Sequence, residues 1–294
     1  MAPIAPLTRD FLWEGHRLVF DDYRPARGPD ERPVLLLPGL LFTRRMHRPL
    51  AETLARRGHR VLCLDLLGHG DSDRPEEMWN YSMPAFGAQA IGLLELLEID
   101  QAVVGGTSLG ANATLEAAVL APQRVRGMLI EMPVLDNALL ACALAFTPLL
   151  VALTFGARGF RALASGARRV PRGSSQLADM LLDWLSQDPK PSASVVQGLL
   201  FGRVAPPRTE RRRLEAPALV IGHPRDPVHP FSDSDMLVGE LPNARLVEAS
   251  SILELRIRPE RLTHEISSFV SACWEIGAAA GRPEGPAAAS ARPA

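Results

Sequence analysis

Gly106-Thr107-Ser108-Leu109-Gly110 is the stretch around which this 294-residue chain is organised. It has the pattern G-x-S-x-G, with apolar residues 102–104 before it and the small-residue segment 111–120 after it. A strand that turns sharply into a helix exposes the central side chain, and glycines are needed where a Cβ would clash. The pattern therefore predicts a nucleophilic Ser108 at a helix N-terminus, where an oxyanion is favoured, rather than an idle serine in a Gly-rich turn.

Apolar runs of strand length alternate with helical segments on both sides of this motif. The runs cover residues 34–37, 61–64, 125–132, 218–221 and 245–248, and a hairpin is expected within residues 11–20. Continuous apolar runs are typical of strands that are buried on both faces. The alternation predicts an α/β fold with a mostly parallel central sheet and helices on both faces.

The alternation stops between residues 133 and 213, where the pattern is helical with loops expected at 171–175 and 188–192. Residues 138–155 hold no charge and are long enough for a membrane span, but Pro148 interrupts them. We expect an apolar lid hairpin broken near Thr147-Pro148, which indicates an apolar substrate or contact with a membrane surface. The expected organisation is a core (1–132 and 214–275), a helical cap (133–213) and a disordered tail (276–294).

Composition excludes several classes of protein. A net charge of -1 gives no electrostatic reason to expect nucleic-acid binding. Cys63, Cys142 and Cys273 are few and far apart, which indicates neither a disulfide framework nor a metal site. The N-terminus has no signal-peptide pattern, so we expect a cytoplasmic protein without a cofactor, and the oligomeric state stays open.

Four motifs together resemble the α/β-hydrolase superfamily, over residues 12–274. They are Pro38-Gly39-Leu40, the loop 65–72, the Ser108 pentapeptide and Arg225-Asp226-Pro227-Val228-His229-Pro230. The resemblance implies an α/β-hydrolase fold with a cap insertion and a nucleophile elbow at Gly106, Ser108 and Gly110.

The resemblance also assigns the groups around Ser108. Asp226 matches the family acid, with Glu131 as a weaker alternative, and the amides of Leu40 and Leu109 would form the oxyanion hole. A serine at the elbow differs from relatives with an aspartate nucleophile, such as haloalkane dehalogenases and epoxide hydrolases.

The sequence departs from the family at the general base. The family usually supplies a histidine after the last strand, but Ile252 lies near that slot and no histidine occurs between His229 and His264. Without an imidazole, a serine hydroxyl is a poor nucleophile. His229 is the best substitute because it follows Asp226 by three residues at the catalytic edge. The other histidines are weaker candidates: His16 and His59 lie on remote turns, His47 could line the pocket, His69 belongs to a structural loop, His223 ends a strand and His264 falls within the last helix.

The favoured function is that of a serine hydrolase. It would act on a carboxylic ester or related acyl substrate with an apolar portion, through a Ser108 acyl-enzyme. Two alternatives stay open: a catalytically impaired binding protein with the same fold, and a cofactor-free perhydrolase or acyltransferase.

Overall fold

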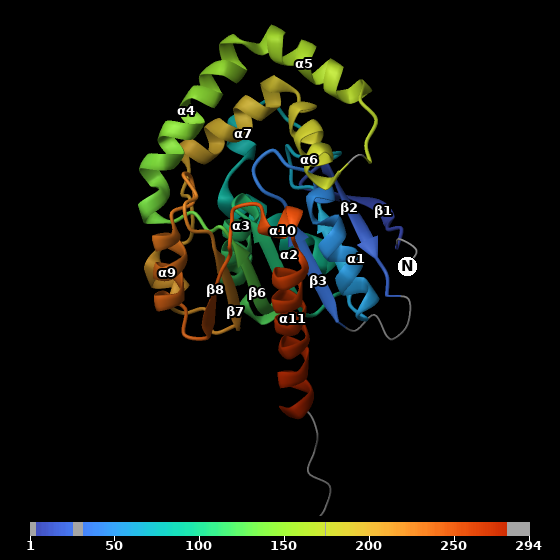
Figure 1. Ribbon diagram of the computed structural model, residues 1–294, viewed down its shortest axis with the longest axis vertical. Coiled ribbons are helices and arrows are strands. Elements are labelled where there is room, and N and C mark those ends of the chain that lie inside the picture. The colour runs from blue at the N-terminus through green and yellow to red at the C-terminus, as the bar shows by residue number, and fades with distance from the viewer. Residues whose placement is uncertain (1–3, 26–31, 174, 281–294) are drawn as a thin grey trace, which may run out of the picture.

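A computed structural model describes residues 4–25, 32–173 and 175–280 of the chain. Eight strands form one sheet in the order β1-β2-β4-β3-β5-β6-β7-β8 (Figure 1). Strand β2 pairs antiparallel with β1 and β4, and every other pair of neighbours is parallel. The predicted α/β class with a mostly parallel sheet is therefore confirmed. The strands are β1 (Leu7–Trp13), β2 (His16–Tyr23), β3 (Pro33–Leu37), β4 (Arg60–Leu64), β5 (Ala102–Thr107), β6 (Val125–Glu131), β7 (Ala218–Gly222) and β8 (Ala244–Glu248).

Helices cover both faces of the sheet, because successive side chains of a strand point to opposite faces. On β3, Leu35 and Leu37 belong to the core cluster shared with α2, α3 and α9, whereas Val34 and Leu36 belong to the cluster shared with α1 and α11. All four side chains are fully buried. The uninterrupted apolar run thus reflects two hydrophobic cores. The core helices are α1 (Arg48–Arg56), α2 (Met83–Leu96), α3 (Leu109–Leu120), α9 (Phe231–Glu240), α10 (Glu254–Ile257) and α11 (Glu260–Ala280).

A helical insertion between β6 and β7 lies above one edge of the sheet (Figure 1). Its helices are α4 (Leu139–Phe155), α5 (Ala157–Arg169), α6 (Gln176–Leu185), α7 (Pro189–Phe201) and α8 (Arg208–Arg211), after the short turn η4 (Asp136–Ala138). Figure 1 shows α4 and α5 as an outer arch, with α7 and α6 lying between that arch and the sheet.

Three local expectations were wrong. Helix α4 is continuous through Pro148, so the apolar segment is not broken there. Proline removes one hydrogen bond to the carbonyl four residues earlier, and here that residue, Leu144, is 69% exposed, so water can replace the bond. The loop expected at 188–192 is instead the start of α7, because Asp188 caps the Lys190 amide and Pro189 occupies the first turn.

The third concerns the C-terminus. Helix α11 continues to Ala280, so the tail expected from residue 276 is helical at its start. The rest of that expected tail, residues 281–294, lies outside the described residues.

Two histidines are buried as neutral side chains in the core. His47 Nε2 lies 2.8 Å from the carbonyl oxygen of Leu37, and His69 Nδ1 lies 3.0 Å from that of Leu67. Burial lowers the pKa of each imidazole to about 4, against an ordinary value of 6.5.

These two groups make stability depend on pH. Between pH 6.5 and 4 the unfolded chain binds protons that the folded chain does not, so the free energy of unfolding should fall as pH is lowered through this window. At pH 4 each histidine would account for on the order of 3 kcal/mol. Urea unfolding across the window measures this slope, and His47→Gln should flatten it, because glutamine keeps a donor for Leu37 but does not titrate. A slope in His47→Gln and in His69→Gln as steep as that of the natural protein would contradict the assignment.

Candidate active site

Ser108 occupies a strained position between β5 and α3. Its φ of 55° and ψ of -112° lie in a region that side chains with a Cβ rarely adopt. The Ser108 amide donates to the Glu131 carbonyl at 2.8 Å, which fixes the turn to the neighbouring strand β6. The side chain does not cap α3, so the hydroxyl remains available to another partner.

The two glycines of the pentapeptide are required by packing. A Cβ on Gly106 would lie 2.5 Å from the Gly110 carbonyl carbon. A Cβ on Gly110 would lie 2.2 Å from the Leu37 carbonyl oxygen. Real side chains cannot approach backbone atoms so closely, and the sharp turn therefore depends on both residues being glycine.

A chain of hydrogen bonds links Ser108 to an acid through an imidazole. Ser108 Oγ lies 2.8 Å from His229 Nε2, and His229 Nδ1 lies 2.9 Å from Asp226 Oδ2. Burial would raise the pKa of Asp226, but the hydrogen bond and charge of His229 and the backbone donors outweigh it and lower that pKa. An ionised Asp226 accepts from Nδ1–H, and this tautomer leaves the lone pair of Nε2 directed at the serine hydroxyl.

A loop that turns back on itself brings Asp226 and His229 together. Asp226 Oδ1 accepts the amides of Val228 at 2.8 Å and His229 at 2.9 Å, while Oδ2 faces the His229 ring. Side chains of aspartate commonly close such turns by accepting amides two and three residues ahead. One carboxylate therefore shapes the loop and orients the imidazole that the loop carries.

The other positions considered for the base do not contact Ser108. Ile252 is 41% exposed on the loop after β8. His223 is buried, with Nδ1 2.9 Å from the Ser251 carbonyl oxygen and Nε2 3.5 Å from Glu131 Oε1. His264 lines a surface groove on α11, and His47 lies behind the elbow rather than along the Ser108 cavity, contrary to expectation.

Glu131 is held in a buried ion pair that the sequence analysis missed. Arg256 Nη2 donates to Glu131 Oε2 at 2.9 Å, and Thr107 Oγ1 donates to the same oxygen at 2.5 Å. Burial would raise the pKa of Glu131, but the Arg256 charge and the hydrogen bonds hold it well below its usual range. Because the Glu131 carboxylate pairs with Arg256 and not with His229, its role is structural. Arg256 itself gave no signal, since sequence alone does not show which carboxylate an arginine will meet.

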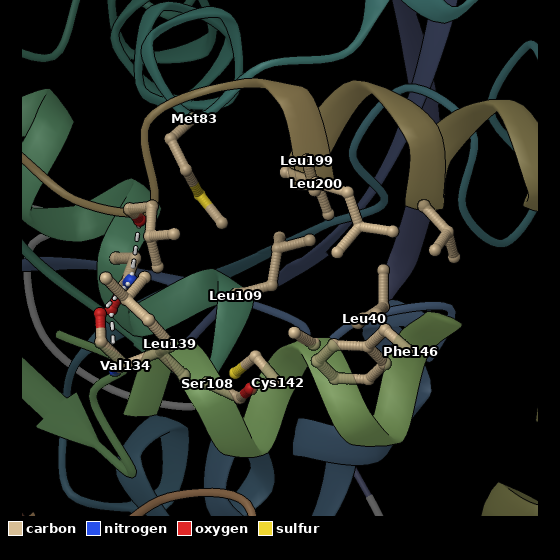
Figure 2. A pocket seen from close by; sticks show the side chains of 14 residues that line it. Leu40, Met83, Ser108, Leu109, Val134, Leu139, Cys142, Phe146, Leu199 and Leu200 are labelled. Carbon is tan, nitrogen blue, oxygen red and sulfur yellow. Dashed lines mark hydrogen bonds between the residues drawn. The ribbon is translucent and has the colours of Figure 1, made fainter. Parts of the chain in front are cut away.

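The Ser108 hydroxyl opens into an apolar cavity of about 170 Å³ beneath α4 (Figure 2). Leu40 and Leu109 also line it, and the assignment of their amides to the oxyanion hole stays a prediction. The remaining lining comes mainly from α4, α7 and their neighbours: Met83, Asn112, Val134, Leu139, Cys142, Ala143, Phe146, Val196, Leu199, Leu200 and Val204.

The other polar groups of the lining are occupied or neutral. Asn112 Nδ2 donates to the carbonyl oxygens of Val134 and Val204, each at 2.7 Å, and Oδ1 accepts the Val134 amide at 3.1 Å. Burial raises the pKa of the Cys142 thiol to about 11, so this thiol stays protonated near neutral pH. Ser108 is thus the lining side chain equipped for reaction. The described residues contain no cluster of metal-ligating side chains.

Three features together are typical of one class of protein: the strained serine between β5 and α3, the mostly parallel sheet and the helical insertion above it. The sequence pattern of the alpha/beta hydrolase fold matches residues 32–251. The chain therefore belongs to the α/β-hydrolase family.

Individual relatives match only a short part of this chain. A 2-hydroxymuconate semialdehyde hydrolase of Pseudomonas sp. (strain CF600) is 36% identical over 74 residues, 25% of this chain and 26% of that protein. Bifunctional epoxide hydrolase 2 of Mus musculus is 36% identical over 75 residues, 26% of this chain and 14% of that protein. The aligned segments thus span about a quarter or less of these two relatives.

Among solved structures, the enol-lactonase from Burkholderia xenovorans LB400 superposes with a TM-score of 0.73 and 21% identity. The alignment covers 90% of this chain and all of that one, which shows a shared fold.

The packing of the elbow can be tested with one methyl group. Gly110→Ala should destabilise the protein by about 1–3 kcal/mol or prevent folding, because the new Cβ meets the Leu37 carbonyl. The matched control is Gly239→Ala in α9, where a Cβ meets nothing within 4 Å and should stabilise by about 0.5–1 kcal/mol. Thermal unfolding of both variants measures the difference, and equal stability would refute the packing argument.

Proposed function

We propose that the protein is a serine hydrolase of carboxylic esters or related acyl compounds with an apolar portion. The observation that carries the proposal is the hydrogen-bonded series from Ser108 through His229 to Asp226, at 2.8 and 2.9 Å. Nucleophile, base and orienting acid within hydrogen-bond reach are what acyl transfer through a serine requires. This geometry favours an enzyme over an impaired binding protein of the same fold.

The mechanism proceeds through an acyl-enzyme. Ser108 Oγ attacks the substrate carbonyl carbon while His229 Nε2 takes the hydroxyl proton, and Asp226 stabilises the resulting imidazolium. The amides of Leu40 and Leu109 hold the oxyanion. A Cβ on Gly39 would lie 3.9 Å from Ser108 Cβ, so the loop that carries Leu40 runs beside the nucleophile. The C–O bond to the leaving alcohol then breaks, and the alcohol takes the proton from His229. Water attacks the acyl-serine by the reverse route, releasing the acid and restoring Ser108.

The cavity supports the choice of substrate class. Leucine, valine, methionine and phenylalanine side chains make up most of its lining. An apolar acyl chain gains free energy by leaving water in such a site, whereas a charged substrate would lose hydration without a partner.

The role of His229 can be tested by substitution. His229→Ala should lower kcat for p-nitrophenyl esters by about 10³-fold or more, because the serine loses its proton acceptor. Stoichiometric labelling by a fluorophosphonate probe should be lost with Ser108→Ala and greatly slowed with His229→Ala. His264→Ala, an exposed histidine of α11, is the matched control and should behave as the natural protein does. Full turnover in a folded His229→Ala protein would exclude this base.

The apolar cavity makes a second prediction, on acyl chain length. kcat/KM should rise with each added methylene by at most about fourfold, which corresponds to roughly 0.8 kcal/mol, before declining when the cavity is full. A series of p-nitrophenyl esters measures this profile. An enzyme that prefers acetyl to every longer acyl group would contradict the assignment of the cavity.

A further inference from the structure

Helix α4 combines a length and composition typical of membranes with an open position on the molecule. Residues Asp136–Phe155 have a mean hydropathy of 2.3 over their most apolar window, and only 17% of that window is buried. Leu140, Leu144 and Phe155 are 71%, 69% and 86% exposed. Water-exposed apolar area of this extent marks a contact surface in a folded protein.

The topology excludes a membrane span. The chain leaves the sheet at β6, forms the insertion and returns to β7, which pairs in parallel with β6. A helix that crossed a bilayer between these strands would put the two halves of one sheet on opposite sides. The inner side of α4 is also engaged, since Leu139, Cys142 and Phe146 line the Ser108 cavity. Only the outer side of α4 is open to a partner.

The positive charge beside α4 favours an anionic partner. Residues 137–178 contain five arginines and no acidic residue, in a chain with a net charge of -1. Four of the arginines follow α4 directly and are exposed residues of α5, the helix next to α4 in the arch of Figure 1. They are Arg158, Arg161, Arg168 and Arg169. Within the described residues none forms an ion pair, although Arg168 Nη2 donates to the Ser186 carbonyl oxygen at 2.8 Å. An apolar helix beside unpaired cations is the composition that binds anionic lipid.

A second copy of the chain fits this surface less well. A symmetric dimer through α4 and α5 would bring the arginines of both copies together, with no acidic residue on either helix to oppose them. We propose that α4 and the arginine side of α5, together called the cap arch, dock the protein reversibly on an anionic phospholipid surface.

Vesicle co-sedimentation tests the cap arch. The full chain carrying Ser108→Ala is used as well as the natural protein, so the result does not depend on hydrolysis. Both should sediment with vesicles of phosphatidylcholine mixed with phosphatidylglycerol, and much less with phosphatidylcholine alone. Binding should weaken as NaCl is raised from about 0.05 M to about 0.5 M, because salt screens the arginines.

Variants separate the two parts of the surface. Leu144→Asp with Phe155→Asp should abolish binding yet leave ester hydrolysis unchanged, because neither side chain lines the cavity. Arg158→Ala with Arg169→Ala should lower the partition coefficient by about 30-fold. The control for the apolar pair is Leu12→Asp, because Leu12 of β1 is 74% exposed and lies outside the insertion. The control for the arginine pair is Arg48→Ala with Arg245→Ala, two exposed arginines that also lie outside the insertion.

Three results would overturn the proposal. They are failure to bind either vesicle, equal binding by the Leu144→Asp, Phe155→Asp protein, and a dimer in sedimentation velocity that the same substitutions dissociate. If the natural protein binds vesicles but hydrolyses no ester, that result would refute the proposed function alone.

Discussion

The approach of α3 to the end of β3 is the constraint on which the site depends. The Leu37 carbonyl lies so close to Gly110 that no side chain fits between them, and His47 Nε2 lies 2.8 Å from the same oxygen. This contact holds the first turn of α3 against the sheet and forces Ser108 into its positive φ. A strained serine persists only where the surroundings determine it on all sides. Here two parallel strands, a helix and a buried imidazole do so.

Much of the fold could be predicted, because it follows from short-range patterns. The run Val34-Leu35-Leu36-Leu37 is apolar at every position since both faces of β3 are buried, and this holds whatever packs on them. The elbow could also be predicted, because its pattern of two glycines around a serine lies within five consecutive residues. The continuity of α4 was not: a proline ends a helix only when the lost hydrogen bond cannot be replaced, and that depends on exposure, which the sequence does not state.

The site shows the same division. Ser108 and Asp226 follow from motifs with fixed places in the chain. His229 could be proposed from its spacing to Asp226, but its approach to Ser108 depends on how the loop folds back around one carboxylate. The Glu131–Arg256 pair could not be predicted from the sequence, because it joins residues 125 positions apart. It lies at the carboxyl ends of β5 and β6, where it anchors the segment that carries Ile252. An ion pair therefore fixes this segment to the core. The segment carries Ile252 at the position where the family usually has the histidine that faces the serine.

Asn112 holds both ends of the insertion. Its side chain accepts from and donates to Val134, where the insertion begins, and donates to Val204, where it ends. The insertion is thus a loop whose two ends meet at one amide side chain, and the entropy of closing such a loop grows only slowly with its length. Helix α7 is also held from below, because Val195 and Val196 are buried in the core cluster, whereas α4 and α5 above it are mostly exposed. Sequence changes in α4 can therefore alter the roof of the cavity, through Leu139, Cys142 and Phe146, without touching the contacts that hold the elbow.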